Sequence, residues 1–367
     1  MPKHHLFVGT WEPPGAIFTF EFDDQTLDLS LAKRTEIPKD EPISWMTMSH
    51  HRKALYGASK KKWSSHAIKS SPTEIAHTAS HPMTHNPEAS KAETRTRAIF
   101  CLAAQKAPYY LYCNPFYEHA GHGSVFSVDG EGILKECIQN YEYAPDSAIH
   151  GMVFDPKEEY LYSADMWANK VWCHKKDANT GKLETVGFVE APKHKDQPRW
   201  VAVHPSGNYL YVLMEHGNTL GVYIIDPKTH LPIYTNISYP LVPEFLVQKS
   251  PSLYRSDVCV LTPSSNTLFA TSRSNKAGIP GYIAAFSLTP SGAIEQQLCL
   301  QPTTTSGGHS NAVSFYPGSK KGEEWMALTD DEVGFIEMYR WDGKWLARVA
   351  RCEVKEPGFG MNAVWYD

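Results

Sequence analysis

The stretch QPRWVAVHPSGNYLYVLMEHGNTLGVYIID, residues 197–226, contains three apolar runs separated by two turn sequences. The runs are rich in β-branched and aromatic residues, and SGN and EHGN are typical of turns. We therefore predict three strands of about six residues each. Arg199 stands where the first of these strands begins, and Glu215 where the second ends; charges at strand ends are usually solvated, so their meaning depends on which other residues lie beside them.

The same pattern recurs along the whole chain. Clear copies begin at residues 149 and 256, and weaker copies begin at residues 43, 97 and 309. A period of roughly 50 residues is typical of β-propeller blades. Strands such as YLYVLM are apolar on both faces, as expected for a blade packed between two neighbours.

The two chain ends supply a seventh unit. GMNAVWYD at 360–367 resembles a first strand, and residues 4–23 resemble a second and third strand. One blade shared by both termini closes the ring and removes exposed strand edges. The sequence therefore predicts an all-β fold, a seven-bladed β-propeller whose single domain spans residues 1–367. Segments 69–97 and 240–254 fall outside the pattern and are predicted to form a lid or a subunit contact.

Composition excludes several classes of protein. There are 35 basic and 40 acidic residues, with no long basic run, so we expect no nucleic-acid partner. The N-terminus lacks the apolar region of a signal peptide, and no apolar window reaches membrane-spanning length, so we expect a cytoplasmic protein without a membrane partner. The seven Cys have no C-x-x-C spacing, which argues against a disulfide framework or a structural zinc site.

In a propeller, the residues before each first strand and those in the turn after each second strand converge on the channel mouth. Before the first strands lie Ser44, Trp45, Arg97, His150, Arg199, Arg255, Asp257, His309, Asn311 and Asn362. After the second strands lie Thr10, Lys60, Asn114, Asp165, Glu215, Arg273 and Asp330. Arg199 and Glu215 are therefore predicted to meet at the mouth of one blade.

These positions predict a binding and catalytic site. Arg199 either binds a ligand carboxylate with its fork of donors or pairs with Glu215. Arg273, His309 and Lys60 are predicted to bind substrate, and His150 to transfer a proton. Aromatic residues in the segment 114–123 could form an apolar wall over the site. We expect no metal, because arginines repel a cation, and no cofactor, because no phosphate loop or dinucleotide fingerprint is present.

Several long stretches resemble one known family. They are GTWEPPGAIFTF, RTEIPKDEPISWMT, KKWSS, QNYEYAPDSAIHGMVFDP, PRWVAVHPSGNYLYVLMEHGN, SGGHSNAVS and EPGFGMNAVWYD. In them the chain resembles the fungal carboxy-cis,cis-muconate cyclases, which are similar to the seven-bladed propeller lactonases that include 6-phosphogluconolactonase.

The resemblance implies a specific activity. It is the lactonisation of 3-carboxy-cis,cis-muconate, a small tricarboxylate of the protocatechuate branch of the β-ketoadipate pathway, without metal or cofactor. It places the site on His150, Arg199, Glu215 and Arg273, and it implies a homo-oligomer. Whether His150 or Glu215 donates the proton stays open. A lactone hydrolase of the 6-phosphogluconolactonase type is the alternative activity, and a non-catalytic scaffold is a third interpretation.

Overall fold

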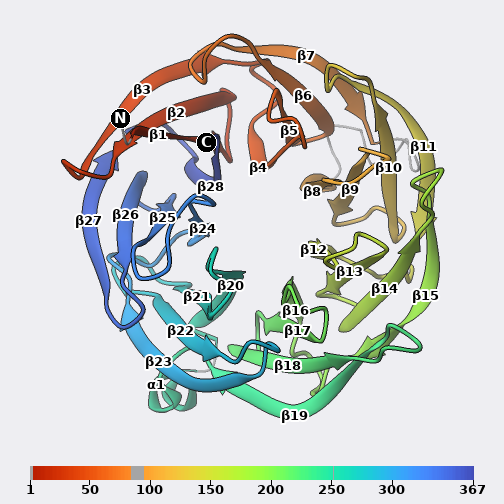
Figure 1. Cartoon of the computed structure of the whole chain (residues 1–367), viewed down its shortest axis with the longest axis vertical. Helices are drawn as coiled ribbons and strands as arrows, with labels where there is room; N and C mark the ends of the chain where they lie inside the picture. Colours follow the sequence, from red (N-terminus) through yellow and green to blue (C-terminus); the bar gives the residue numbers. More distant parts are fainter. Residues whose placement is uncertain (1–2, 84–94, 251) are drawn as a thin grey trace.

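The computed structural model describes residues 3–83, 95–250 and 252–367, which form seven four-stranded antiparallel sheets arranged as blades around a central channel (Figure 1). The predicted seven-bladed β-propeller is confirmed. The innermost strands are β28 (Phe359–Trp365), β4 (Ile43–Met48), β8 (Arg97–Ala103), β12 (Ile149–Phe154), β16 (Pro198–Val203), β20 (Tyr254–Leu261) and β24 (Val313–Phe315). They coincide with the predicted first strands, except that β24 begins at Val313, whereas the repeat pattern placed the start of this unit at residue 309.

The second and third strands of the blades follow the innermost ones in the same order. The second strands are β1 (Lys3–Thr10), β5 (Ala54–Ser59), β9 (Leu111–Phe116), β13 (Tyr160–Asp165), β17 (Tyr209–Met214), β21 (Thr267–Ser274) and β25 (Glu324–Asp330). The third strands are β2 (Ala16–Asp23), β6 (Lys62–Ile68), β10 (His122–Val128), β14 (Lys170–Lys176), β18 (Thr219–Ile225), β22 (Tyr282–Leu288) and β26 (Phe335–Trp341).

Each blade also has a fourth, outermost strand that the repeat pattern did not reveal. These strands are β3 (Asp28–Glu36), β7 (Ile75–Pro82), β11 (Leu134–Glu142), β15 (Leu183–Glu190), β19 (Pro232–Pro240), β23 (Ile294–Pro302) and β27 (Leu346–Glu353). Most of their residues are exposed or half-buried. Strands that bury little surface lack the apolar pattern that marks the inner strands, which explains why they escaped prediction.

Of the two segments predicted to lie outside the blades, one contributes a strand to a blade. Segment 69–97 includes β7, the outermost strand of its blade, and its residues 84–94 lie outside the described part of the chain. Segment 240–254 contains the short helix α1 (Glu244–Lys249), which lies outside the ring near β23 (Figure 1), and its residue 251 is not described. The predicted role as a lid or subunit contact is therefore untested for segment 240–254 and for the part of segment 69–97 that follows β7.

Ring closure uses both termini as predicted. Strand β28 pairs antiparallel with β1, with Leu6 opposite Trp365. The guanidinium of Arg52, in the next blade, donates to the carbonyl oxygens of Trp365 at 2.9 Å and Tyr366 at 2.6 Å. The C-terminal strand is therefore held by its own blade and by a neighbour.

Blades pack through both faces, as the all-apolar second strands predicted. In β17, Leu210 and Val212 share a cluster with residues of β13, whereas Tyr211 and Leu213 share a cluster with residues of β21. Alternate residues of one strand thus enter two interfaces, and burial between blades supplies the apolar core.

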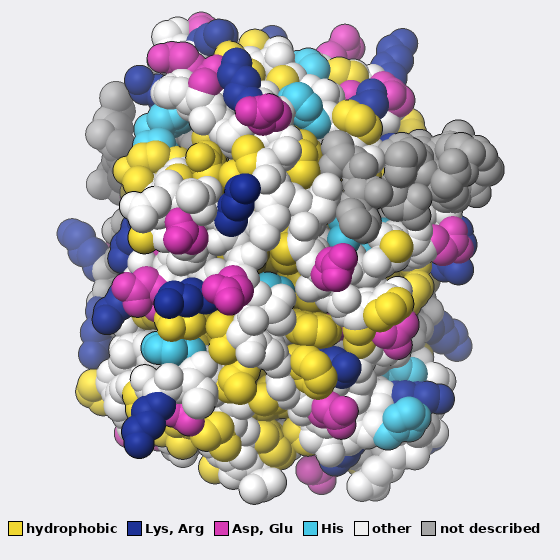
Figure 2. Space-filling model, turned by 90° about the vertical axis from the view of Figure 1, so that its right-hand side faces the viewer, with side chains coloured by type: hydrophobic (Ala, Val, Ile, Leu, Met, Phe, Trp, Pro, Cys, Tyr) yellow, Lys and Arg dark blue, Asp and Glu magenta, His cyan; other side chains and the backbone are white. Residues whose placement is uncertain are grey.

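The outer surface is mixed in charge. Basic and acidic side chains are interspersed on the face shown in Figure 2. Among the described residues, no helix has the length and apolarity to span a membrane.

Candidate active site

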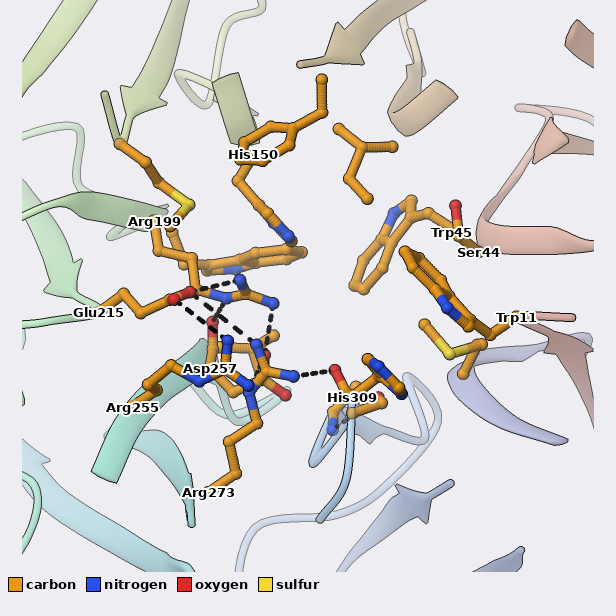
Figure 3. Close-up of a pocket in the computed structure, with 18 of the residues that line it drawn as sticks. Trp11, Ser44, Trp45, His150, Arg199, Glu215, Arg255, Asp257, Arg273 and His309 are labelled. Carbon is orange, nitrogen blue, oxygen red and sulfur yellow. Dashed lines mark hydrogen bonds and ion pairs between the residues drawn. The ribbon is translucent and has the colours of Figure 1, made fainter. Parts of the chain in front are cut away.

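A cavity of about 140 Å³ lies in the central channel, and charged residues occupy one side of it (Figure 3). The side chains come from the innermost strands and from the ends of the second strands, as the propeller geometry predicted. The lining residues include Trp11, Trp45, Phe116, Tyr117, His150, Arg199, Trp200, Glu215, Arg255, Asp257, Arg273 and His309. Three arginines and two acidic residues therefore share one small space.

Aromatic rings form the floor of this cavity. Trp45 lies 4.7 Å from Trp200 and 5.1 Å from Phe100, measured between ring centroids. Beyond these rings the channel widens into a second space lined mainly by apolar residues of the innermost strands. Gly151 leaves room for the floor, since a Cβ there would come within 3.1 Å of Trp200 Cε3 and 2.8 Å of the Arg199 carbonyl oxygen.

Arg199 is held entirely by protein acceptors. Its Nη1 donates to Glu215 Oε2 at 2.5 Å, its Nη2 to Asp257 Oδ1 at 2.7 Å, and its Nε to the Asp257 carbonyl at 3.1 Å. Burial alone would lower the pKa of Arg199, but the two carboxylates raise it above its ordinary value. Of the two predicted roles, the structure shows the pairing with Glu215.

Asp257 is a central residue to which the sequence alone assigned no role. It binds Arg199, lies 3.8 Å from Arg273 Nε, and accepts the backbone N–H of Asn311 at 2.7 Å. Although burial favours the neutral acid, Arg273 and Arg199 hold the pKa of Asp257 at about 2. The sequence had placed it at the channel mouth beside Arg255, on an innermost strand, but did not indicate its pairing with Arg199.

Arg273 and Arg255 make fewer hydrogen bonds than Arg199, and neither is hydrogen-bonded to a carboxylate in the described structure. Arg273 Nη1 donates to the carbonyl oxygens of Gly308 and His309, while its Nη2 lies 3.9 Å from Glu215. Arg255 Nη1 lies 3.8 Å from Glu215. The Nε of both arginines is buried without a hydrogen-bond partner in the structure. Burial lowers the pKa of Arg273 to about 10, so it stays cationic at neutral pH.

His150 lies opposite Arg273 across the cavity (Figure 3). Its ring packs edge-on against Phe116 at 5.6 Å, and its buried Nδ1 has no hydrogen-bond partner among the described residues. Burial, followed by the positive charge of Arg199, holds the pKa of His150 well below its ordinary value. The imidazole is therefore neutral in the free protein. Glu215 does not hold it protonated, because the carboxylate of Glu215 is bound to Arg199.

Comparison with known proteins identifies the family. The model of the seven-bladed β-propeller lactonases matches residues 5–309. The chain belongs to this lactonase family. It is 59% identical, over the full length of both chains, to a carboxy-cis,cis-muconate cyclase of Neurospora crassa. It is also 31% identical, over about half of each chain, to muconate cycloisomerase 1 of Cutaneotrichosporon cutaneum. The resemblance to the cyclases inferred from the sequence is confirmed.

Two bacterial proteins of known structure share the fold of this chain. The periplasmic gluconolactonase of Pseudomonas aeruginosa superposes with a TM-score of 0.79 at 13% identity and covers 99% of each chain. A Bacteroides fragilis protein provisionally assigned as a 6-phosphogluconolactonase also gives 0.79, at 15% identity, over 100% of this chain and 98% of that one. At these identities the likeness establishes the fold alone.

His309 and Lys60, the other two residues predicted to bind substrate, lie in different places relative to the cavity. His309 lines the cavity and stacks on Trp11 with ring centroids 5.4 Å apart, but its side chain is 62% exposed and binds Asp331 through Nδ1 at 2.8 Å. Lys60 does not line the cavity, and this placement corrects its predicted role. It lies in the tight turn between β5 and β6 with a positive φ of 55°, and its carbonyl accepts the N–H of Ala98 at 2.6 Å.

Other polar residues at predicted mouth positions hold turns together. Asp165 accepts the backbone N–H of Ala148 at 2.9 Å and the indole N–H of Trp172 at 2.9 Å. Asp330 accepts the backbone N–H of Val333 at 2.9 Å and the hydroxyl of Thr305. The apolar wall predicted in segment 114–123 does contribute Phe116 and Tyr117 to the cavity lining.

The donor set of the cavity does not suit a metal ion. Within residues 3–83, 95–250 and 252–367, no group of three or more His, Cys, Asp and Glu side chains is arranged to hold one. Glu215 and Asp257, the two acidic residues of the cavity lining, are already bound to Arg199. A cation placed there would meet three guanidinium groups, which repel it.

Proposed function

We propose that the protein is a carboxy-cis,cis-muconate cyclase, which converts 3-carboxy-cis,cis-muconate into a carboxymuconolactone. The observation that carries the proposal is the pair Arg255 and Arg273, whose guanidinium groups share the cavity with His150. The name of the 59% identical Neurospora crassa relative supports the same substrate. Guanidinium groups recognise carboxylates, and an imidazole can transfer a proton near neutral pH.

The reaction is an internal rearrangement in which no atom is lost. One carboxylate oxygen of the diene forms a C–O bond to an alkene carbon. The electron pair of that double bond moves to the adjacent carbon, where the neighbouring carboxylate stabilises it, and this carbon then accepts a proton. The site must therefore fold a flexible anion, accept charge that moves within it, and supply one proton.

Arginines provide the first two requirements. Arg273 and Arg255 bind carboxylates of the substrate, so that the attacking oxygen is held close to the double bond. Such fixed orientation can supply several kcal/mol of the barrier in an intramolecular reaction. Arg199 acts as a positioning residue, because its donors hold Glu215 and Asp257 in place beside the other two arginines.

His150 provides the proton. In the free protein its pKa is well below its ordinary value because of burial and the charge of Arg199. A bound tricarboxylate adds negative charge opposite the arginines and favours the imidazolium, so the substrate itself prepares the acid. Proton transfer from a positioned side chain typically contributes about 10² to 10⁴-fold to the rate.

Ultraviolet absorbance of the diene gives the direct test. Purified protein treated with a chelator is mixed with 3-carboxy-cis,cis-muconate, and the product is identified by NMR. Rapid loss of absorbance with formation of a carboxymuconolactone supports a cyclase that needs no metal or cofactor. No loss of absorbance, with hydrolysis of 6-phosphogluconolactone instead, would assign the protein to the hydrolases of the same family.

We also propose that the enzyme works in the cytoplasm as a homo-oligomer, with a small tricarboxylate as its substrate and without a nucleic-acid or membrane partner. The net charge of −5 and the mixture of basic and acidic side chains on the face shown in Figure 2 argue against a nucleic-acid partner, and the resemblance to the cyclases is the ground for the oligomer. Light scattering of the purified protein and fractionation of the source cells test it. A monomer in solution would contradict the oligomer.

A further inference from the structure

Arg255 and Arg273 form a pair of like charges whose arrangement is unfavourable without a ligand. They are directly opposite each other on the antiparallel strands β20 and β21. Like charges at directly opposed positions of two strands repel, so such a pair is costly unless an anion lies between or beside them. In the free protein Glu215 lies 3.8 Å from Arg255 and 3.9 Å from Arg273, and Asp257, which is hydrogen-bonded to Arg199, lies 3.8 Å from Arg273 Nε.

The closest contacts of Glu215 lie elsewhere. Its Oε2 accepts from Arg199 Nη1 at 2.5 Å, whereas both contacts to the opposed arginines exceed hydrogen-bond length. The Nε of each opposed arginine is buried without a hydrogen-bond partner in the structure. Buried donors without an acceptor are uncommon in folded proteins and call for an explanation. Carboxylates of a ligand in the cavity would place acceptors and negative charge beside both guanidinium groups.

The two arginines differ in depth. The side chain of Arg273 is 4% exposed, and its Nη1 is anchored by the carbonyl oxygens of Gly308 and His309. The side chain of Arg255 is 38% exposed and has no such anchor in the described structure. Arg273 is therefore a fixed cation inside the cavity, whereas Arg255 is a cation at the side open to solvent that can turn toward an incoming group.

We propose that Arg255 determines specificity for a tricarboxylate over a dicarboxylate, because it binds the additional carboxylate while Arg273 binds one that both substrates possess. This inference rests on the proposed function for the identity of the substrate. It concerns binding alone, so it can be tested with stable analogues that do not react.

Saturated analogues of the tricarboxylate and of the dicarboxylate allow the two affinities to be compared without reaction. Butane-1,2,4-tricarboxylate has the carbon skeleton of 3-carboxymuconate, and adipate has that of muconate. Titration calorimetry at fixed ionic strength measures both dissociation constants for the wild type, R255Q, R255K and R340Q. Arg340 is an exposed arginine on the third strand of another blade, and R340Q controls for the loss of a positive charge.

The expected result is a loss of selectivity. R255Q should bind the tricarboxylate about 10- to 100-fold more weakly, the range of one sheltered charge-assisted contact, while the affinity for adipate changes less than about 3-fold. R255K should restore part of the selectivity, and R340Q should bind like the wild type. An equal loss for both analogues in R255Q, or no loss for either, would overturn the inference.

A separate measurement distinguishes failure of the inference from failure of the proposed function. Turnover of 3-carboxy-cis,cis-muconate by the wild type tests the function. Wild-type turnover with unchanged selectivity in R255Q would refute the role of Arg255 while leaving the cyclase intact. Absence of turnover, with selective loss of tricarboxylate binding in R255Q, would refute the proposed cyclase activity and would still show that Arg255 determines specificity for the tricarboxylate.

Discussion

Arg199 donates to Glu215 at 2.5 Å in a pair in which both side chains are more than nine-tenths buried. The two residues are on different strands of one blade, and Asp257 of the next blade binds the other side of the same guanidinium. Buried ion pairs are rarely a net source of stability, but removal of one partner leaves an uncompensated charge. The pair therefore fixes the positions of these side chains in the cavity, and the stability of the fold depends on both partners being present.

Replacement of Glu215 by Gln tests this dependence. We expect E215Q to lower the free energy of unfolding by about 3 kcal/mol, because Arg199 stays buried with one carboxylate instead of two. Glu353 offers a matched control, since it pairs with Arg351 at 2.7 Å but its side chain is 49% exposed. E353Q should cost less than about 1 kcal/mol. Urea unfolding checks both variants, and equal losses would contradict the prediction.

Substrate binding should be coupled to proton uptake at His150. Because burial and Arg199 depress the pKa of His150 in the free protein, the imidazole binds its proton only when carboxylates enter the cavity. Butane-1,2,4-tricarboxylate binding near pH 7 should therefore take up a fraction of a proton, more at pH 6 than at pH 8. Calorimetry in buffers of different ionisation enthalpy measures this uptake.

The variant H150N supplies the control for that experiment. It should bind the analogue without the buffer-dependent heat and should lose about 10² to 10⁴-fold in kcat. If H150N shows the same proton uptake as the wild type, the proton goes to another group and the assignment of His150 as the acid is wrong.

Gly151 should be essential for the cavity floor. A Cβ at this position would lie 2.8 Å from the Arg199 carbonyl and 3.1 Å from Trp200 Cα, so neighbouring backbone must shift. We expect G151A to lower the free energy of unfolding by about 1–3 kcal/mol and to reduce kcat/KM, because Arg199 and Trp200 both line the site. At Gly130 an added Cβ would meet no atom within 4 Å, and G130A should change both quantities little.

Thermal unfolding, tryptophan fluorescence and steady-state kinetics of the two glycine variants check this prediction. The fluorescence of G151A should change because the ring of Trp200 lies against the added methyl group. A G151A protein with the stability and activity of G130A would show that the floor tolerates the extra atom.

Stability should fall as the pH drops below about 6.5. His66 is fully buried, its ring nitrogen Nε2 lies 3.0 Å from Ser64 Oγ, and burial lowers its pKa to about 3. An unfolded histidine titrates near 6.5, so between these values the unfolded chain binds more protons than the native one. The stabilisation is complete above the unfolded pKa and declines with falling pH, by up to about 1.4 kcal/mol per pH unit for this group.

Urea unfolding of the wild type and H66Q between pH 5 and pH 7 measures this slope. H66Q should show a shallower decline than the wild type, because Gln does not titrate. Exposed His194 is the control, and H194Q should keep the wild-type slope. The same sign is expected from His174, whose pKa burial lowers to about 4, so part of the slope should remain in H66Q.

How much of the fold the sequence predicts depends on which strands bury surface. The three inner strands of each blade carry the apolar pattern because they pack between neighbouring blades, as Leu210 and Tyr211 of β17 illustrate. The outermost strands, such as β3 with mostly exposed residues, carry no such pattern and were found only in the structure. A buried strand requires apolar residues that can be seen in the sequence, whereas an exposed edge strand is held by backbone hydrogen bonds that any residue can make.

The sequence by itself determined the ring of seven blades, its closure by the two termini, and the convergence of Arg199, Glu215, Arg273 and His150, because the repeat places equivalent positions at one channel mouth. Only the tertiary structure decided which charges pair. It commits Arg199 to Glu215 and Asp257, leaves Arg255 opposite Arg273, and keeps Lys60 in a turn away from the cavity. Pairing depends on distances of a few ångströms between side chains of different blades, and electrostatic energy changes steeply over that range, so strand order alone does not determine it.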